Sequence, residues 1–88
     1  MAWKIEFSSR ANKDLEKLDS QSQKLIKDYL DDRLLKLAHP KQAGKALTNS
    51  FKGLWRYRVD NFRIICKIQE NKLIILVLQI GHRSEVYN

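Results

Sequence analysis

The sequence predicts one α+β domain, in which two N-terminal helices pack on one face of a small and mainly antiparallel sheet. A chain of 88 residues has room for one modest hydrophobic core. Apolar residues alternate with polar ones near the start of the chain and again in its second half, which is the period of a strand with one buried face. Between these regions the apolar residues have the spacing of amphipathic helices, so the predicted order is β-α-α-β-β-β.

The chain is predicted to start with a strand and a short helix. The sequence WKIEF at residues 3–7 alternates between apolar and charged side chains, as a strand with one buried face does. Residues 10–18 have apolar side chains at helical spacing, and Ser8 or Ser9 can cap the helix that they predict.

The second helix is predicted to be the longer one, with an apolar stripe over residues 25–37. Ser20 and Gln23 have the spacing of a capping box at its start. Pro40 cannot continue a helix and disfavours helical angles at the residue before it, so the helix should end there. We therefore expect His39 to be a structural residue at the C-cap.

Three strands are predicted in the second half of the chain, after a connecting loop at residues 41–53 that has no apolar period. They are expected at residues 54–60, 62–69 and 73–80. Asp60 and Asn61 form the tight turn between the first two of them. The last strand, LIILVLQI, is apolar on both sides, which indicates a central strand that is covered on both faces.

The side chains of the predicted hairpin divide sharply between its two faces. The apolar face, which begins with Trp55 and Phe62, is the one that the helices should cover, so Arg56, Arg58 and Arg63 share the opposite face. Like charges on neighbouring strands repel one another, and a guanidinium group suits bidentate contact with phosphate. Because the formal net charge is +7 as well, we expect this face to bind a polyanion.

The remaining composition excludes several classes of protein. Cys66 is the only cysteine and lies within an apolar strand, so we interpret it as a core thiol of a protein from a reducing compartment. The N-terminal residues lack the apolar region of a signal peptide, and the apolar run LIILVL is far shorter than the ~20 residues that span a bilayer. We expect a soluble, cytoplasmic protein without a membrane partner.

Two stretches of the sequence, GLWRYRVDNFRIICKI and IGHRSEVY, together with the order of elements, resemble the RelE branch of the RelE/ParE superfamily of bacterial and archaeal toxins. The resemblance is strongest over residues 47–87 and implies a single RelE-like toxin domain over residues 1–88, with a fold similar to that of microbial ribonucleases. It implies an mRNA endoribonuclease that acts in the A site of the translating ribosome. It also implies a cognate, RelB-like antitoxin and no metal or other cofactor.

The resemblance further implies a set of functional residues. The catalytic positions are Arg58, Arg63, Arg83 and Tyr87, and the substrate-binding positions are Lys52, Arg56 and His82. The implied reaction is attack of the 2′-hydroxyl of the RNA on the adjacent phosphate, which leaves a 2′,3′-cyclic phosphate and a 5′-hydroxyl. Arginines keep their protons at any ordinary pH, so they can stabilise charge but make poor bases. Proton transfer then falls to Tyr87 or His82, and the sequence leaves this choice open.

Three functions remain open at this point. The first is the ribosome-dependent ribonuclease, and the second is a gyrase-poisoning toxin of the ParE branch, which shares the fold but lacks this combination of basic residues and C-terminal tyrosine. The third is an RNA-binding module without activity. If the chain is a toxin, we expect the antitoxin to contribute an acidic segment that is partly disordered until bound, and the free toxin to be a monomer that forms a hetero-oligomer with it.

Overall fold

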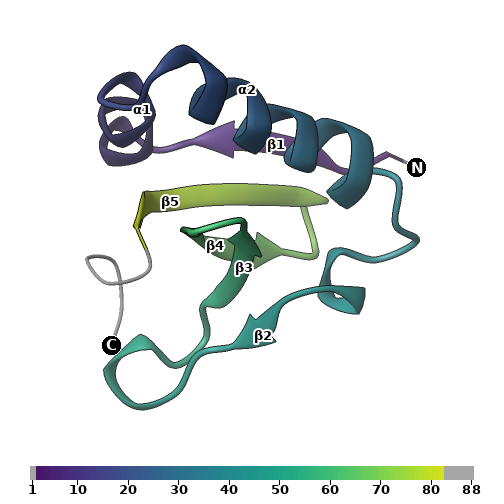
Figure 1. The fold of residues 1–88 in the computed structure, drawn as a ribbon. Coiled ribbons are helices and arrows are strands. Elements are labelled where there is room, and N and C mark those ends of the chain that lie inside the picture. The colour runs from purple at the N-terminus through teal and green to yellow at the C-terminus, as the bar shows by residue number, and fades with distance from the viewer. Residues whose placement is uncertain (1, 83–88) are drawn as a thin grey trace.

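The computed structural model describes residues 2–82, which form a five-stranded sheet with two α-helices packed on one face (Figure 1). The helices are α1 (Ser9–Glu16) and α2 (Ser20–Asp28), and the strands are β1 (Lys4–Phe7), β2 (Lys45–Ala46), β3 (Trp55–Val59), β4 (Phe62–Gln69) and β5 (Ile74–His82). The order across the sheet is β1-β5-β4-β3-β2. β1 is parallel to β5 and the other neighbours are antiparallel, which confirms the predicted α+β class and the central position of the last strand.

The core lies between the helices and the sheet, where α1, α2 and their continuation pack on alternate residues of β3, β4 and β5. Cys66 is fully buried there, as predicted, and burial raises the pKa of its thiol. Tyr57 is also fully buried, and its hydroxyl donates a hydrogen bond of 2.7 Å to the carbonyl oxygen of Pro40. This bond satisfies the one polar group that Tyr57 brings into the core.

The start of α2 differs from the prediction. Asp19 is the N-cap, and its carboxylate accepts a hydrogen bond of 3.2 Å from the backbone N–H of Ser22. Hydrogen bonding to the side chain of Ser22, and then to its backbone, lowers the pKa of Asp19. The side chain of Gln23 donates to the carbonyl oxygen of Leu18 over 2.8 Å. The predicted capping box of Ser20 and Gln23 is therefore wrong, because a strong capping residue stands one position earlier.

The end of this helix also differs from the prediction. α2 continues as a π-helical segment, Tyr29–Leu34, and stops before it reaches the proline. His39 has the extended backbone that a residue before proline prefers, and its ring nitrogen accepts a hydrogen bond of 3.1 Å from the backbone N–H of Lys41. It caps the start of the short 3-10 helix Pro40–Gln42, so the predicted C-cap role is wrong. None of the described helices is both long enough and apolar enough to cross a membrane.

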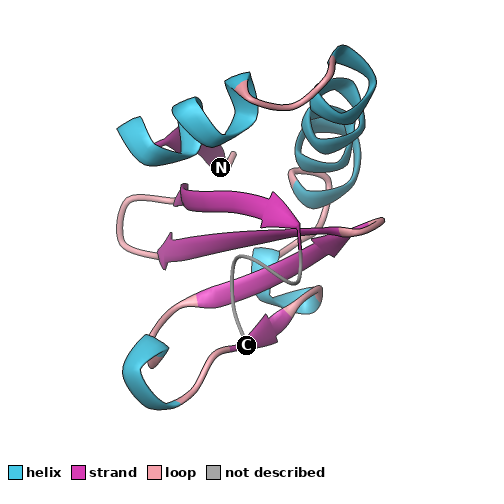
Figure 2. Cartoon of the chain, turned by 60° about the vertical axis from the view of Figure 1, so that its left-hand side comes forward, coloured by secondary structure: helices cyan, strands magenta, loops and turns pink. Residues whose placement is uncertain are grey.

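The predicted loop at residues 41–53 contains a strand that the sequence pattern did not reveal. β2 pairs Lys45 with Arg56 and Ala46 with Trp55 at the border of the sheet. Figure 1 and Figure 2 show it on the opposite side of the sheet from α1 and β1. Two residues are too few to produce a visible alternation, so this strand depends on its partner β3 rather than on its own sequence.

The junction between α1 and β5 completes the sheet on its other side. β5 continues beyond the last residue that pairs with β1, and within residues 2–82 side chains of α1 and its cap replace the missing neighbour. The Ser8 hydroxyl donates a hydrogen bond of 3.0 Å to the carbonyl oxygen of Leu78. The Asp14 carboxylate accepts one of 3.0 Å from the backbone N–H of Ile80. We call these two contacts the α1–β5 junction.

Candidate functional site

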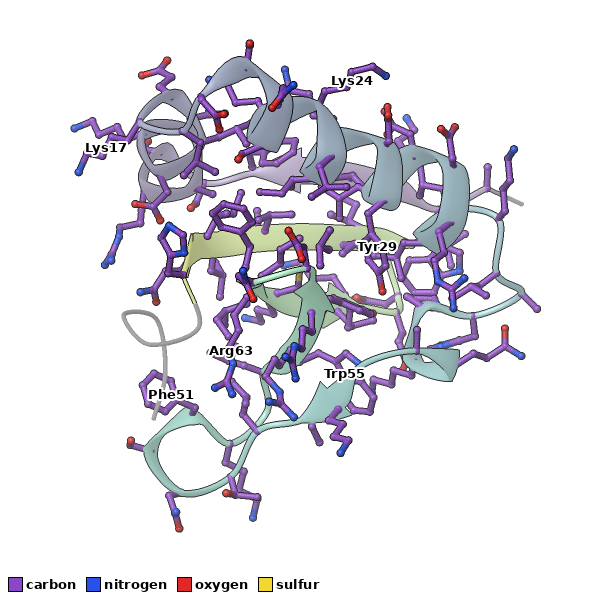
Figure 3. All side chains as sticks on the ribbon, in the orientation of Figure 1. Lys17, Lys24, Tyr29, Phe51, Trp55 and Arg63 are labelled. Carbon is purple, nitrogen blue, oxygen red and sulfur yellow. The ribbon has the colours of Figure 1, made fainter. Side chains whose placement is uncertain are left out.

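Arg56, Arg58 and Arg63 lie on the side of the sheet that the helices leave open, as predicted. Arg58 stands directly opposite Arg63 in the β3–β4 pair, and Arg56 follows on the same face two residues away. Tyr57, which lies between Arg56 and Arg58 on β3, points into the core instead. In Figure 3, Arg63 lies on the side of the sheet away from the helices. We call these three residues the arginine face.

The charge on this face is only partly compensated within the described residues. The carboxylates that form ion pairs in residues 2–82 belong to Asp14, Asp28 and Glu70, and their partners are side chains other than Arg56 and Arg58. Arg58 makes one long hydrogen bond of 3.5 Å, to the carbonyl oxygen of Asp60. Cross-strand pairs of like charge are destabilising, so an anion bound on this face relieves repulsion.

A small apolar cluster borders the arginine face. It consists of Leu47, Phe51, Leu54 and Ile65. Ile65 pairs with Arg56, so the cluster continues the same face toward the loop before β3. Lys52 follows Phe51 in that loop and is exposed, but within the described residues no hydrogen bond or ion pair joins it to the arginines. Lys52 is therefore at the periphery of this face.

His82 lies on the other side of the sheet from the arginines. It pairs with Phe62, whose ring centroid is 4.7 Å from that of the imidazole, and Phe62 belongs to the core beneath the helices. A β-bulge explains this position, because Ile65 pairs with Gln79 whereas Cys66 pairs with Val77, which leaves Leu78 as an extra residue.

The bulge exchanges the two faces for the rest of β5. Without it, alternation from Val77 would place His82 on the arginine face. With it, Ile80 and His82 turn toward the helices, and Gly81 is the residue that stands opposite Arg63. His82 therefore does not share a face with the three arginines, and the substrate-binding role expected for it stays a prediction. Gly81 adds no side chain beside the Arg58–Arg63 pair.

Two of the predicted catalytic residues, Arg83 and Tyr87, lie outside the described residues, so their positions stay predictions. What the structure does place is the strand that leads to them. β5 ends at His82, in the row next to the one that contains Gly81, Arg63 and Arg58. Residue 82 is thus at the same end of the sheet as the most closely spaced pair of arginines.

A cavity of about 480 Å³ adds residues that the sequence pattern did not single out. It lies at the edge of the sheet beside β3 and is lined by Arg33 and Lys45 as well as by Arg56 and Arg58. One signal was present in the sequence. Arg33 follows Tyr29 by four residues, which places both on one side of a helix. Lys45 reaches the cavity because it pairs with β3 as part of β2, and the sequence pattern does not reveal that strand.

The chemistry available on the arginine face is binding and charge stabilisation. Guanidinium groups donate fixed, charged hydrogen bonds to phosphate oxygens but do not transfer protons at ordinary pH. Among residues 2–82, no group of three or more His, Cys, Asp or Glu side chains could hold a metal ion. A reaction at this face would therefore need a proton-transfer group from outside it.

The whole chain is similar to known bacterial toxins. Residues 5–87 match the family model described as the ParE toxin of the type II toxin-antitoxin system, parDE. Toxin RelG from Mycobacterium tuberculosis is 23% identical over 87 residues, which cover 99% of this chain and 98% of that protein.

Two solved structures share the fold. A chain of the toxin-antitoxin complex RelBE2 from Mycobacterium tuberculosis is 21% identical, with a TM-score of 0.85 and a coverage of 97% of this chain and 95% of that one. The isolated RelE toxin of E. coli is 23% identical, with a TM-score of 0.72 and a coverage of 98% of this chain and 92% of that one. At these identities the likeness is one of fold.

Proposed function

The chain belongs to the ParE toxin family of type II toxin–antitoxin systems, and on that premise we propose that it is an endoribonuclease that cleaves mRNA in the ribosomal A site and so inhibits translation. The observation that carries this proposal is the arginine face, where Arg58 and Arg63 stand opposite each other on the open side of the sheet. Clustered guanidinium groups suit an RNA backbone, because they bind phosphate in a bidentate way and neutralise its charge.

In the proposed reaction the 2′-hydroxyl oxygen of the RNA attacks the neighbouring phosphorus. The new O–P bond closes a 2′,3′-cyclic phosphate while the bond to the 5′-oxygen breaks, and that oxygen takes up a proton to leave as a hydroxyl. Arg58 and Arg63 stabilise the charge that builds up on the phosphorane, together with Arg83. Arg56 and Lys52 hold the flanking backbone.

One proton must leave the 2′-hydroxyl and another must reach the 5′-oxygen. We assign removal of the 2′-hydroxyl proton to Tyr87, whose phenol would have its pKa lowered by neighbouring guanidinium groups, and the 5′-oxygen takes its proton from Tyr87 in turn or from water. The position of His82 on the helix side of the sheet, against the ring of Phe62, supports Tyr87 over His82 for this role. No step of this route requires a metal ion.

We also propose that a cognate antitoxin inactivates the chain by covering the arginine face with an acidic segment. The solved RelBE2 structure, which has the same fold, is a complex of a toxin with its antitoxin. Opposite charge on the two surfaces would steer their association. The proposed target, the translating ribosome, places the activity in the cytoplasm.

The test is single-turnover cleavage of mRNA on programmed ribosomes, with the ends of the products identified. We expect a 2′,3′-cyclic phosphate and a 5′-hydroxyl, full loss of cleavage when the nucleotide at the cut site is 2′-deoxy, and no effect of chelators. A 3′-hydroxyl product, or cleavage of the deoxy substrate, would contradict the proposal.

A second candidate function is gyrase poisoning, since the matching family model carries the name of the ParE toxin. Incubation of the protein with gyrase and supercoiled DNA tests it directly. Accumulation of gyrase-cleaved DNA, with no effect on programmed ribosomes, would replace the ribonuclease by this alternative.

A further inference from the structure

The cavity beside β3 combines four cationic side chains in one place. Arg56 and Arg58 reach it from β3, Lys45 from β2, and Arg33 from the π-helical segment that follows α2. No Asp or Glu is among the described residues that line it, and no ion pair within residues 2–82 involves any of the four cations. Four positive charges with no counter-charge among residues 2–82 favour the binding of an anion in this cavity.

The wall of the cavity is held in place by contacts inside the protein. The Tyr57 hydroxyl binds the carbonyl oxygen of Pro40 over 2.7 Å, and the indole N–H of Trp55 donates to the carbonyl oxygen of Ala43, also over 2.7 Å. These two bonds fix the segment before β2 against β3. Lys45 follows this segment as the first residue of β2, so its backbone is positioned before any ligand arrives.

Gly44 allows this segment to approach β3 closely. Its φ is +75°, and a Cβ atom at this position would lie 2.4 Å from the carbonyl oxygen of Arg56. Such a contact is not possible for a residue with a side chain, so the shape of the cavity depends on glycine here. A wall formed in advance lowers the ordering cost of binding.

Tyr29 provides a neutral donor in the same cavity. Its ring packs 6.3 Å from that of Tyr57, and Figure 3 shows it between the helix and the sheet. Burial raises the pKa of the Tyr29 hydroxyl, against the opposing effect of Arg33 beside it. The hydroxyl therefore keeps its proton and can donate a hydrogen bond to an anionic oxygen.

We propose that this cavity binds a second phosphate group of the RNA, next to the one held by the arginine face, with Arg33 and Lys45 as its specific contacts. This inference rests on the proposed function, because it takes the RNA to cross the arginine face. Arg56 and Arg58 belong to both sites, so a strand that leaves the arginine face across β3 arrives at the cavity. A volume of about 480 Å³ is on the scale of pockets that hold small molecules and can take a nucleotide rather than a carboxylate alone.

The test compares two double variants that remove the same charge. Arg33→Gln with Lys45→Gln changes the cavity, and Lys13→Gln with Lys27→Gln changes exposed lysines of α1 and α2, so each lowers the net charge from +7 to +5 (7 − 2). The probe is a fluorescent 2′-O-methyl RNA decamer, which binds but cannot be cleaved. We expect the cavity variant to bind it about tenfold more weakly than the control variant, and the salt dependence to fall by about 0.7 in slope for each lost phosphate contact.

Equal affinities of the two double variants would overturn the proposal, because only long-range charge would then matter. A decaglutamate peptide provides a second probe. Loss of peptide binding without loss of RNA binding would identify the cavity as a site for acidic protein and would also overturn it. A charge-keeping variant, Arg33→Lys with Lys45→Arg, should bind RNA better than the glutamine variant, and its circular dichroism spectrum shows whether the cavity tolerates substitution.

Cleavage by the unchanged chain on programmed ribosomes separates this proposal from the proposed function. If the chain cleaves mRNA while both double variants bind the decamer equally, the second phosphate site alone is wrong. If the chain cleaves nothing while the cavity variant alone loses RNA binding, the cavity is an RNA site and the ribonuclease proposal is wrong.

Discussion

Replacing Asp14 by alanine should destabilise the fold far more than the loss of a surface carboxylate usually does. The side chain of Asp14 is only 13% exposed, and its carboxylate accepts the backbone N–H of Ile80 over 3.0 Å. Removing the acceptor leaves that N–H unpaired in a place where water reaches it poorly. A hydrogen bond to a charged group contributes about 1.5–3 kcal/mol, and the expected loss in the free energy of unfolding is therefore about 2 kcal/mol.

The ion pair of Asp14 with Arg10 adds little to this value, because its N–O distance is 3.5 Å and the side chain of Arg10 is 65% exposed. For a domain of this size, a loss of about 2 kcal/mol lowers the melting temperature by roughly 10 °C. Asp14→Asn keeps an acceptor oxygen without the charge, so its effect should be smaller than that of Asp14→Ala.

The matched control is Asp28→Ala, which removes one carboxylate and one ion pair but no bond to the backbone. Its partner Lys24 lies 2.8 Å away, and both side chains are largely exposed. Urea denaturation followed by circular dichroism measures the three variants. If Asp14→Ala and Asp28→Ala unfold at the same urea concentration, the carboxylate of Asp14 does not support β5 and the reasoning is refuted.

Three further predictions concern the site and the core. Tyr87→Phe should keep ribosome binding and slow single-turnover cleavage by about 10²- to 10⁴-fold, as expected for the loss of a general acid or base, and an undiminished rate would contradict the role assigned to it. Gly44→Ala should lower the free energy of unfolding by about 2–4 kcal/mol in urea denaturation, because it combines a positive φ with a clash against backbone, and a variant as stable as the parent would disprove that clash. Because burial raises the pKa of the Cys66 thiol, iodoacetamide at pH 8 should label it only in denaturant, and rapid labelling of the folded chain would show that the thiol is accessible.

The arginine face was predictable because β3 alternates without interruption and β4 alternates around Arg63. Each apolar residue from Trp55 to Val59 has an arginine between it and the next, so a period of two is enough to assign both faces. The position of His82 was not predictable in this way. β5 is apolar on both sides, so the extra residue Leu78 leaves no trace in its pattern, although it reverses the faces of everything after it.

The cavity beside β3 could not be predicted from the sequence for a different reason. Arg33 and Lys45 belong to segments that meet only because hydrogen bonds from Trp55 and Tyr57 fix the chain before β2 against the sheet. Such bonds join residues 12 and 17 positions apart, and no local pattern encodes them. The sequence also left the N-cap of α2 undecided, because Asp19 and Ser20 are both good capping residues. Only the packed helix selects between them.

The α1–β5 junction also bears on how the molecule behaves at high concentration. A strand whose backbone N–H and carbonyl groups are left open is a template on which the strand of another molecule can assemble, and this is a common route to aggregation. Along the end of β5 these groups are already taken by the Ser8 hydroxyl and the Asp14 carboxylate, and an inward-pointing carboxylate repels an incoming carbonyl oxygen. The same contacts that stabilise the fold therefore protect the folded chain from edge-to-edge self-association at high concentration.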